Sequence, residues 1–245
     1  MHSHELGVRW SDLDPNRHLN NVMYVAYAEE ARAAMVEAGD LPAGRPTGAV
    51  TVAFRQPLLL TRRPVRVESV LDGDELVQEI CVDGDAGRTV FAQVTSTLGS
   101  HALPPATSGP GGVTCLLRRR DLDASGTCTL AGLFDLVQEG RTRYAAEHRD
   151  LFPSDALAVG RMTMRMGDPL PWRQEPYEVR SWISKVSGAL VMIESEIVDG
   201  DTAHVHASSV HMPFDVATQR SRRLTPEERE RLSTLVTPAA VDEAV

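Results

Sequence analysis

The sequence has few cysteines, no long apolar run and a deficit of positive charge. Only three cysteines, at positions 81, 115 and 128, occur in 245 residues, and their spacing fits no metal site. At least one of them must stay unpaired, which favours reduced thiols. We therefore expect a cytoplasmic protein.

Composition also argues against a membrane or nucleic-acid role. No apolar run approaches the roughly 20 residues that a membrane-spanning helix requires, so no membrane insertion is expected. The first residues, MHSHE, lack the basic and apolar regions of a secretory signal. A net charge of −9 argues against a nucleic-acid binder. With 42% hydrophobic residues, the chain can form one large domain or two small ones.

The sequence contains an internal repeat. A shift of 109 positions aligns the Asp-Leu-Asp of residues 12–14 with that of residues 121–123. A shift of 116 positions aligns the Val-Asp-Gly-Asp of residues 82–85 with that of residues 198–201. Further matches lie between these two in the same order, and the offset grows in one direction. This pattern indicates a duplication with small loop insertions.

A segment rich in proline and glycine separates the two copies. Residues 104–112, PPATSGPGG, show no apolar periodicity and favour a linker, with a long surface loop as the alternative. The expected divisions are a first domain over 1–103, this linker, a second domain over 113–219 and a polar tail over 220–245.

Each copy predicts one helix followed by an antiparallel meander. Apolar residues at helical spacing predict helices over 21–38 and 130–148, with Asn20 as N-cap and Gly39 at the end of the first. A short strand over about 6–10 is expected before the first helix. This order is typical of an α+β fold in which the sheet covers the helix. The other expected strands span 48–54, 65–71, 76–82, 89–98, 157–165, 177–184, 190–198 and 203–212.

The tail differs in character from the two copies. Thr225 as N-cap, Pro226 at the first helical position and the following glutamates predict a short helix. Because this segment is polar and follows several arginines, we expect it to be solvated and assign it no chemistry.

Residues 10–24, WSDLDPNRHLNNVMY, carry the candidate chemistry. Asp14, Asn16 and His18 occupy alternate positions in a loop that leads into the first helix. A carboxylate and an imidazole placed in this way could orient a water molecule against a polarised carbonyl, with Asn16 holding the geometry. The N–H groups at the helix start could stabilise an oxyanion. The same residue types also form ordinary capped turns, so the residues alone leave both interpretations open.

The segment closely resembles the signature of plant and bacterial acyl-ACP thioesterases. It is also similar to the wider 4-hydroxybenzoyl-CoA thioesterase group, which shares the hotdog fold. The pattern of these proteins is Trp-Ser-Asp-Leu-Asp-x-Asn-x-His-x-Asn-Asn-x-x-Tyr, and every fixed position is present between Trp10 and Tyr24. The match is specific over about fifteen residues, and the order of helix and strands extends it weakly over the whole chain.

The resemblance implies a tandem, or double, hotdog of the α+β class. In each half a long helix is wrapped by an antiparallel sheet, and active sites lie between two hotdogs. It implies that Asp14 is the catalytic carboxylate, acting as a nucleophile or as a base on water, and that Asn16 and His18 assist it. No cofactor and no metal are expected. Substrate contacts are assigned to Asn20, Asn21, Tyr24, Tyr27 and Gln56.

The chain departs from the pattern at two places. In the second copy Ser125 replaces Asn16 and Thr127 replaces His18, so we expect the site around Asp123 to be silent. The plant enzymes carry a functional glutamate on the strand after the helix, whereas the corresponding residues 53–58 contain no carboxylate. Gln56 could take its place, and this difference favours acyl-CoA over acyl-ACP.

Several other reactive residues have simpler explanations. Cys128 could be a nucleophile, but it aligns with Leu19, which favours a small buried residue. The histidines at 204, 206 and 211 alternate along an expected strand without a carboxylate or cysteine at ligand spacing, which argues against a metal site.

Charged pairs and clusters also have structural explanations. Arg62–Arg63 and Arg118–Arg120 could meet the phosphates of coenzyme A, although solvated strand ends are the favoured interpretation. Glu30 with Arg32, repeated as Glu139 with Arg141, is expected to form structural ion pairs.

The sequence thus predicts an acyl thioesterase acting on an acyl-CoA or acyl-carrier-protein substrate. One rival is a hotdog hydratase or dehydratase of 2-enoyl thioesters, whose motif places Asn-Pro before the histidine, whereas here Pro15 precedes Asn16. Another rival is a non-catalytic acyl-binding protein. A homo-oligomer is possible, since hotdog proteins often pair further.

Overall fold

The chain divides into two compact units. The computed structural model describes all residues except 86, 108–111, 153–155, 216–217, 219 and 238–245. Unit 1 comprises residues 1–101 and 129–134, and unit 2 comprises residues 102–128 and 135–245. Helix α2 (Leu130–Glu147) therefore begins in unit 1 and continues in unit 2.

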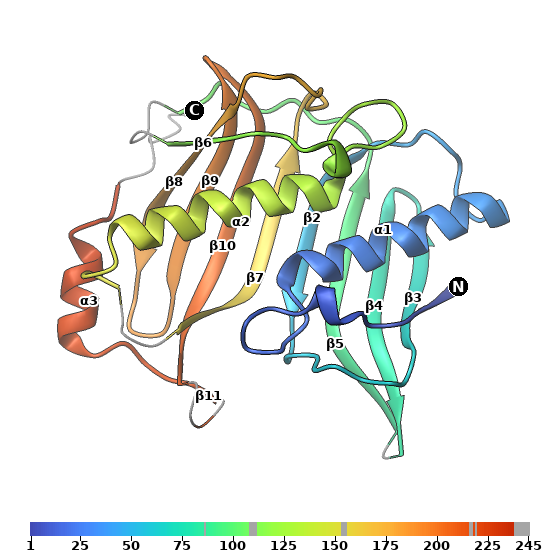
Figure 1. The fold of residues 1–245 in the computed structure, drawn as a ribbon, viewed down its shortest axis with the longest axis horizontal. Coiled ribbons are helices and arrows are strands. Elements are labelled where there is room, and N and C mark those ends of the chain that lie inside the picture. The colour runs from blue at the N-terminus through green and yellow to red at the C-terminus, as the bar shows by residue number, and fades with distance from the viewer. Residues whose placement is uncertain (86, 108–111, 153–155, 216–217, 219, 238–245) are drawn as a thin grey trace. The chain divides into compact units, whose positions relative to one another are not determined.

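Unit 1 consists of a long helix on one face of an antiparallel sheet. Helix α1 (Asn21–Ala38) lies along the sheet in Figure 1 and contacts four of its strands. The strand order is β1-β3-β4-β5-β2, and every pairing within it is antiparallel. The strands are β1 (His2–Leu6), β2 (Thr47–Phe54), β3 (Val65–Asp72), β4 (Glu75–Gly84) and β5 (Gly87–Leu98).

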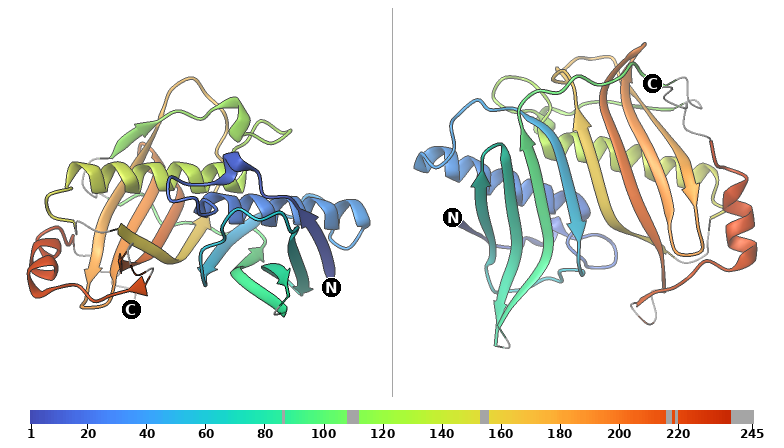
Figure 2. Two further views of the ribbon diagram at one scale, coloured as in Figure 1. Left: turned by 60° about the horizontal axis from the view of Figure 1, so that its bottom comes forward. Right: turned by 180° about the vertical axis from the view of Figure 1, so that it is seen from behind.

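Unit 2 repeats this topology. Its strand order is β7-β10-β9-β8-β6, in which each strand takes the place of the strand numbered five lower in unit 1. The right-hand view of Figure 2 shows the strands of unit 2 from the face opposite α2. The strands are β6 (Val113–Cys115), β7 (Ala156–Met166), β8 (Tyr177–Val186), β9 (Val191–Asp199) and β10 (Thr202–Asp215), and the short β11 (Arg220–Ser221) pairs with β10. The shared order confirms the α+β duplication.

Most predicted elements are confirmed. Both long helices are present, and α1 has the predicted bounds. The strand predicted at 6–10 is wrong, because β1 ends at Leu6 and residues Trp10–Asp12 form a short 3-10 helix. This turn forms because the N–H of Arg9 donates to the Asp12 carboxylate (2.8 Å) and the N–H of Asp12 donates to the Arg9 carbonyl (3.1 Å). No described helix has the length and apolarity needed to cross a membrane.

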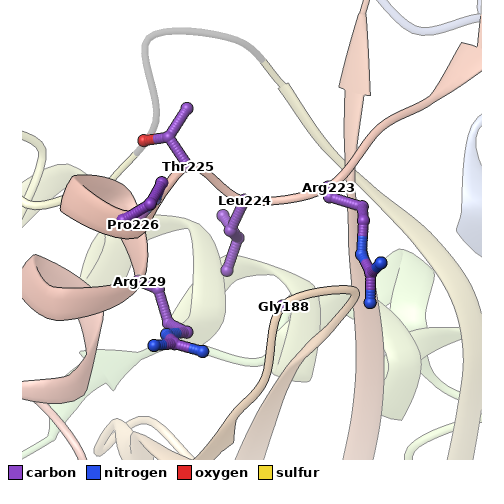
Figure 3. Close-up of a pocket in the computed structure, with 6 residues that line it drawn as sticks. All are labelled: Gly188, Arg223, Leu224, Thr225, Pro226 and Arg229. Carbon is purple, nitrogen blue, oxygen red and sulfur yellow. The ribbon is translucent and has the colours of Figure 1, made fainter.

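The tail helix forms as predicted, and most of its residues are exposed to solvent, but one side of it is buried. Helix α3 (Pro226–Ser233) is capped by the Thr225 hydroxyl, which accepts the Glu228 N–H at 3.2 Å. Leu224 and Leu232 are buried and join a core cluster formed with strands β8 and β9. In Figure 3 Leu224 points between the arginines that flank a cavity of about 230 Å³. The apolar side chains of a largely polar segment thus anchor it to unit 2.

The described part of the predicted linker is bound to unit 2. Both the N–H and the hydroxyl of Thr107 donate to the buried carboxylate of Glu196, at 3.1 and 2.9 Å. The Arg180 guanidinium donates to the Thr107 carbonyl at 2.7 Å. The remaining linker residues 108–111 lie outside the described residues.

The ion pairs predicted within the helices are wrong. Residues two apart on a helix point to different sides, so Glu30 and Arg32 do not face each other. Arg32 instead donates to the hydroxyl of Thr47. In α2, Glu139 pairs with Arg143 at 2.6 Å, four residues along the helix.

Arg141 on α2 and His211 on β10 are both buried, and the charge of Arg141 acts on His211. The Arg141 guanidinium donates to the Met162 sulfur at 4.0 Å, and burial lowers the pKa of Arg141 to about 10. The His211 Nε2 lies 2.9 Å from the Ser209 hydroxyl. Burial, together with the nearby Arg141 charge, holds the pKa of His211 well below its usual range. His211 is therefore neutral in the folded protein.

Replacement of His211 should make the free energy of unfolding depend less on pH below neutrality. Below about pH 6.5 a histidine in the unfolded chain binds a proton, whereas His211 in the folded protein stays unprotonated. The free energy of unfolding therefore falls by up to about 1.4 kcal/mol for each pH unit that the pH is lowered. The variant His211→Gln should lose less stability than the wild type between pH 7 and pH 5, measured as urea midpoints. His206→Gln, on the same strand, is the control for removing a histidine. Parallel curves for wild type and His211→Gln would contradict the account.

Candidate active site

The first motif loop is closed on the carboxylate of Asp14. Its Oδ1 accepts the N–H of Asn16 at 2.8 Å and the N–H of His18 at 2.9 Å. The N–H of Asp14 in turn donates to the His18 carbonyl at 2.8 Å. The loop therefore has one defined conformation, and the three residues predicted to be catalytic lie within it.

One antiparallel bridge closes this loop on itself, and a second anchors it to another segment of unit 1. Leu13 is bridged to Leu19, and His18 is bridged to Leu59. The N–H of Leu19 donates to the Leu58 carbonyl at 2.7 Å, and both leucine side chains are buried. The apolar residues between the polar ones thus hold the loop on the core.

Tyr24 and Tyr27, predicted to contact substrate, support the loop from α1. The Tyr24 hydroxyl accepts the N–H of Leu58 at 3.2 Å, and burial raises the pKa of Tyr24 to about 12. The Tyr27 hydroxyl donates to the Asp12 carboxylate at 2.7 Å. Both rings are buried and both hydroxyls have protein partners, so the structure gives them a positioning role. Their contact with a substrate stays a prediction.

One backbone N–H at the start of α1 has no hydrogen-bond acceptor in the described part of the chain. Asn20 is the N-cap, as predicted, and its side chain accepts the N–H of Val22 at 3.1 Å. The Asn20 carbonyl accepts the N–H of Met23 at 2.8 Å. The N–H of Asn21 has no acceptor in the described part of the chain. A first-turn N–H in this state can stabilise negative charge on a bound oxygen.

Arg17 holds a backbone conformation that favours glycine. Its φ is 64°, the single positive value among the described non-glycine residues. The aligned residue in the second copy is Gly126, with φ 82°. A side chain in this left-handed region costs about 1–2 kcal/mol. The first loop retains its shape despite this strain, because the Asp14 hydrogen bonds and the two bridges determine it.

Three polar groups of the loop are available to a ligand. In the described part of the chain, the Asp14 Oδ2, the Asn16 side-chain amide and the His18 ring have no hydrogen-bond partner. Asn16 is exposed, whereas Asp14 and His18 are half-buried. The loop therefore offers a carboxylate oxygen, an amide and an imidazole to a ligand or to water.

The second loop has the same backbone but a locked carboxylate. Asp123 Oδ1 accepts the N–H of Ser125 at 2.8 Å, the Ser125 hydroxyl at 2.6 Å and the N–H of Thr127 at 3.1 Å. The Thr127 hydroxyl donates to the remaining oxygen, Oδ2, at 3.0 Å. Although partial burial acts to raise it, these hydrogen bonds from Ser125 and Thr127 lower the pKa of Asp123. Both oxygens are occupied and the carboxylate is a weakened base.

The N–H groups at the start of α2 donate to side chains of the protein. The two carboxylate oxygens of Glu29, on α1, accept the N–H groups of Leu130 and Ala131, both at 2.8 Å. Burial raises the pKa of Glu29 against the opposing effect of these two hydrogen bonds. The Thr129 hydroxyl accepts the next N–H, that of Gly132, at 3.0 Å. These first-turn donors are therefore unavailable to an oxyanion. Sequence reasoning missed Glu29, because no local pattern links residues 101 positions apart.

The other candidates from the sequence lie outside the Asp14 loop. Gln56 is exposed, and its amide donates to the Val90 carbonyl at 3.2 Å. Cys128 is partly buried, and no cluster of His, Cys, Asp or Glu able to hold a metal occurs among the described residues. Arg119 lies over the Trp172 ring, with the guanidinium carbon 3.5 Å from the ring centroid.

Comparison with known proteins agrees with the fold and the motif. Residues 8–102 match the family model described as the thioesterase-like superfamily. No curated protein sequence matches the chain. The similarity among solved structures extends over both units.

Three solved structures illustrate this similarity. The 12:0-ACP thioesterase from Umbellularia californica has a TM-score of 0.66 at 13% identity, covering 86% of this chain and 93% of its own. A protein provisionally named oleoyl thioesterase from Lactobacillus plantarum has a TM-score of 0.67 at 11% identity, with coverages of 87% and 96%. An acyl-ACP thioesterase from Bacteroides thetaiotaomicron has a TM-score of 0.56 at 12% identity, with coverages of 85% and 96%. The chain has the double-hotdog fold.

Removal of the Glu29 carboxylate should destabilise the protein. The variant Glu29→Ala leaves two N–H groups of α2 without their acceptor, and loss of a helix cap costs about 0.5–2 kcal/mol. We expect a clear fall in Tm by differential scanning calorimetry. Glu30→Ala, which removes the exposed neighbour, should change Tm little. Equal effects of the two substitutions would show that the cap contributes nothing.

Proposed function

We propose that this protein hydrolyses acyl thioesters at the loop that contains Asp14. The observation that carries the proposal is the contrast between the two copies of the loop. Asp14 retains one uncommitted carboxylate oxygen beside an uncommitted amide and imidazole, whereas both oxygens of Asp123 are hydrogen bonded. The thioesterase-like superfamily match covers the first copy of the loop.

The proposed reaction begins with Asp14 acting as a base on water. Its Oδ2 removes a proton as the water oxygen attacks the thioester carbon, and the N–H of Asn21 stabilises the resulting oxyanion. The carbon–sulfur bond then breaks to give the acid and a thiolate, which takes up the proton held by Asp14. Asn16 and His18 orient the water and the thioester. Direct attack by the carboxylate on the thioester carbon is the alternative mechanism.

The substrate is proposed to be an acyl-CoA or an acyl-carrier-protein thioester. Proteins named as acyl-ACP thioesterases share the fold, which supports a carrier-linked acyl group. The absence of a carboxylate at residues 53–58 is the departure that favours coenzyme A as the carrier. The cytoplasmic location and a further pairing of chains stay predictions.

The substitution Asp14→Asn tests the proposed base. The asparagine oxygen can still accept the two loop N–H groups, so the loop should keep its conformation while the base is lost. We expect kcat to fall by about 10²–10⁴, the range that acid–base catalysis supplies. Asp123→Asn is the matched control in the second copy and should retain activity. Unchanged turnover in Asp14→Asn would favour a non-catalytic acyl-binding protein.

A paired assay separates hydrolysis from hydration. The protein is incubated with a saturated acyl-CoA and with the corresponding 2-enoyl-CoA, while free thiol and enoyl absorbance are followed. Release of thiol from the saturated substrate is expected. Loss of enoyl absorbance without thiol release would instead identify a hydratase.

A further inference from the structure

An exposed apolar surface borders the Asp14 loop. Trp10 is 82% exposed, Leu59 56% and Leu60 53%, and these are three of the six exposed large hydrophobic side chains in the described part of the chain. We refer to these three residues as the apolar rim. Clustered exposed apolar side chains of this size mark binding surfaces more often than isolated ones do.

The bridge pattern places the apolar rim beside a residue proposed to be catalytic. Leu59 is directly opposite His18 in an antiparallel bridge, and directly opposed residues point to the same side. Their neighbours Leu19 and Leu58 are buried. The side chains of Leu59 and His18 therefore both point away from the core. Leu60 follows the isolated bridge and is also exposed.

Trp10 lies in the turn that precedes the Asp14 loop. Its carbonyl accepts the N–H of Leu13 at 3.4 Å, one residue before Asp14. The 3-10 turn that begins at Trp10 therefore leads directly into the reactive loop. The indole and the loop are positioned by the same set of backbone hydrogen bonds.

In the second copy, the positions equivalent to Trp10 and Leu60 contact each other. There the bridge Thr127–Pro171 replaces His18–Leu59, so Trp172 occupies the position of Leu60. Arg119 occupies the position of Trp10, and its guanidinium lies 3.5 Å above the Trp172 ring. The two positions are thus neighbours in the fold. In the second copy, where both oxygens of Asp123 are hydrogen bonded, Arg119 covers the Trp172 ring. In the first copy, where one Asp14 oxygen has no partner among the described residues, the Trp10 ring is exposed.

We propose that Trp10, Leu59 and Leu60 bind the thiol-side chain of the substrate, the long flexible arm through which a carrier holds an acyl group. This inference rests on the proposed thioester hydrolysis. The thiol side must stay connected to a bulky carrier in solvent, which an exposed surface permits, whereas the acyl chain gains most from full burial. An exposed indole in the turn that leads into the Asp14 loop suits the partly apolar chain on the sulfur side of the thioester.

The test compares two substrates with the same acyl group and different thiols. One is an acyl-CoA, and the other is the short N-acetylcysteamine thioester, which lacks most of the arm. In Trp10→Ala and Leu60→Ala, KM for acyl-CoA should rise about tenfold, a loss of about 1.4 kcal/mol of binding. The kcat for acyl-CoA and the kcat/KM for the short thioester should stay near wild type. Trp10→Phe should recover most of the affinity, and Trp172→Ala should leave both substrates unaffected.

Two results would overturn the proposal. An equal loss with both substrates would mean that the apolar rim serves the acyl group or the fold, and no loss with either would mean that it does not contact substrate. Both results differ from a failure of the proposed hydrolysis. If the protein does not hydrolyse thioesters, the wild type releases no thiol from either substrate.

Discussion

The carboxylate of Asp14 folds the loop that it is proposed to serve. Its Oδ1 accepts the N–H groups of Asn16 and His18, and this leaves Oδ2 for chemistry. One oxygen therefore organises the loop while the other can act on water. The bridge from His18 to Leu59 connects the loop to the segment between β2 and β3, and Tyr24 and Tyr27 connect it to α1. A substitution that disturbed the first oxygen would misplace the second.

The duplication explains why one copy can be reactive while the other is not. Four backbone hydrogen bonds and a pair of bridges recur at equivalent positions in both loops. In the second copy, the hydroxyls of Ser125 and Thr127 turn inward and satisfy both oxygens of Asp123. The N–H groups of Leu130 and Ala131 at the start of α2 are likewise satisfied by Glu29. The second copy thus keeps the architecture of a site, and its polar groups stabilise the fold.

Periodicity and turn chemistry predicted most of the fold. The spacing of apolar residues predicted both long helices, and the repeated Val-Asp-Gly-Asp marked the β4–β5 and β9–β10 hairpins. The motif brought Asp14, Asn16 and His18 into one loop, as predicted. The loss of Asn and His in the second copy predicted that only the first loop is reactive, and this stays a prediction. The inward turn of the Ser125 and Thr127 hydroxyls depends on side-chain geometry that no residue pattern encodes.

Long-range contacts were beyond prediction. Glu29 meets the start of α2 across 101 residues, and the tail leucines Leu224 and Leu232 pack on strands far from them in sequence. In both cases the local sequence looks like an ordinary polar surface. Burial of His211 beside Arg141 is similar, because neither residue type favours a core position by itself.

The central claim, one competent loop per chain, is tested most directly by binding stoichiometry. A non-hydrolysable thioether analogue of an acyl-CoA can be titrated into the protein by isothermal calorimetry. The account predicts one analogue bound per chain and loss of that binding when the Asp14 loop is disrupted by Leu19→Asp. Two analogues bound per chain, or binding that survives disruption of the first loop and is lost on disruption of the second, would contradict it.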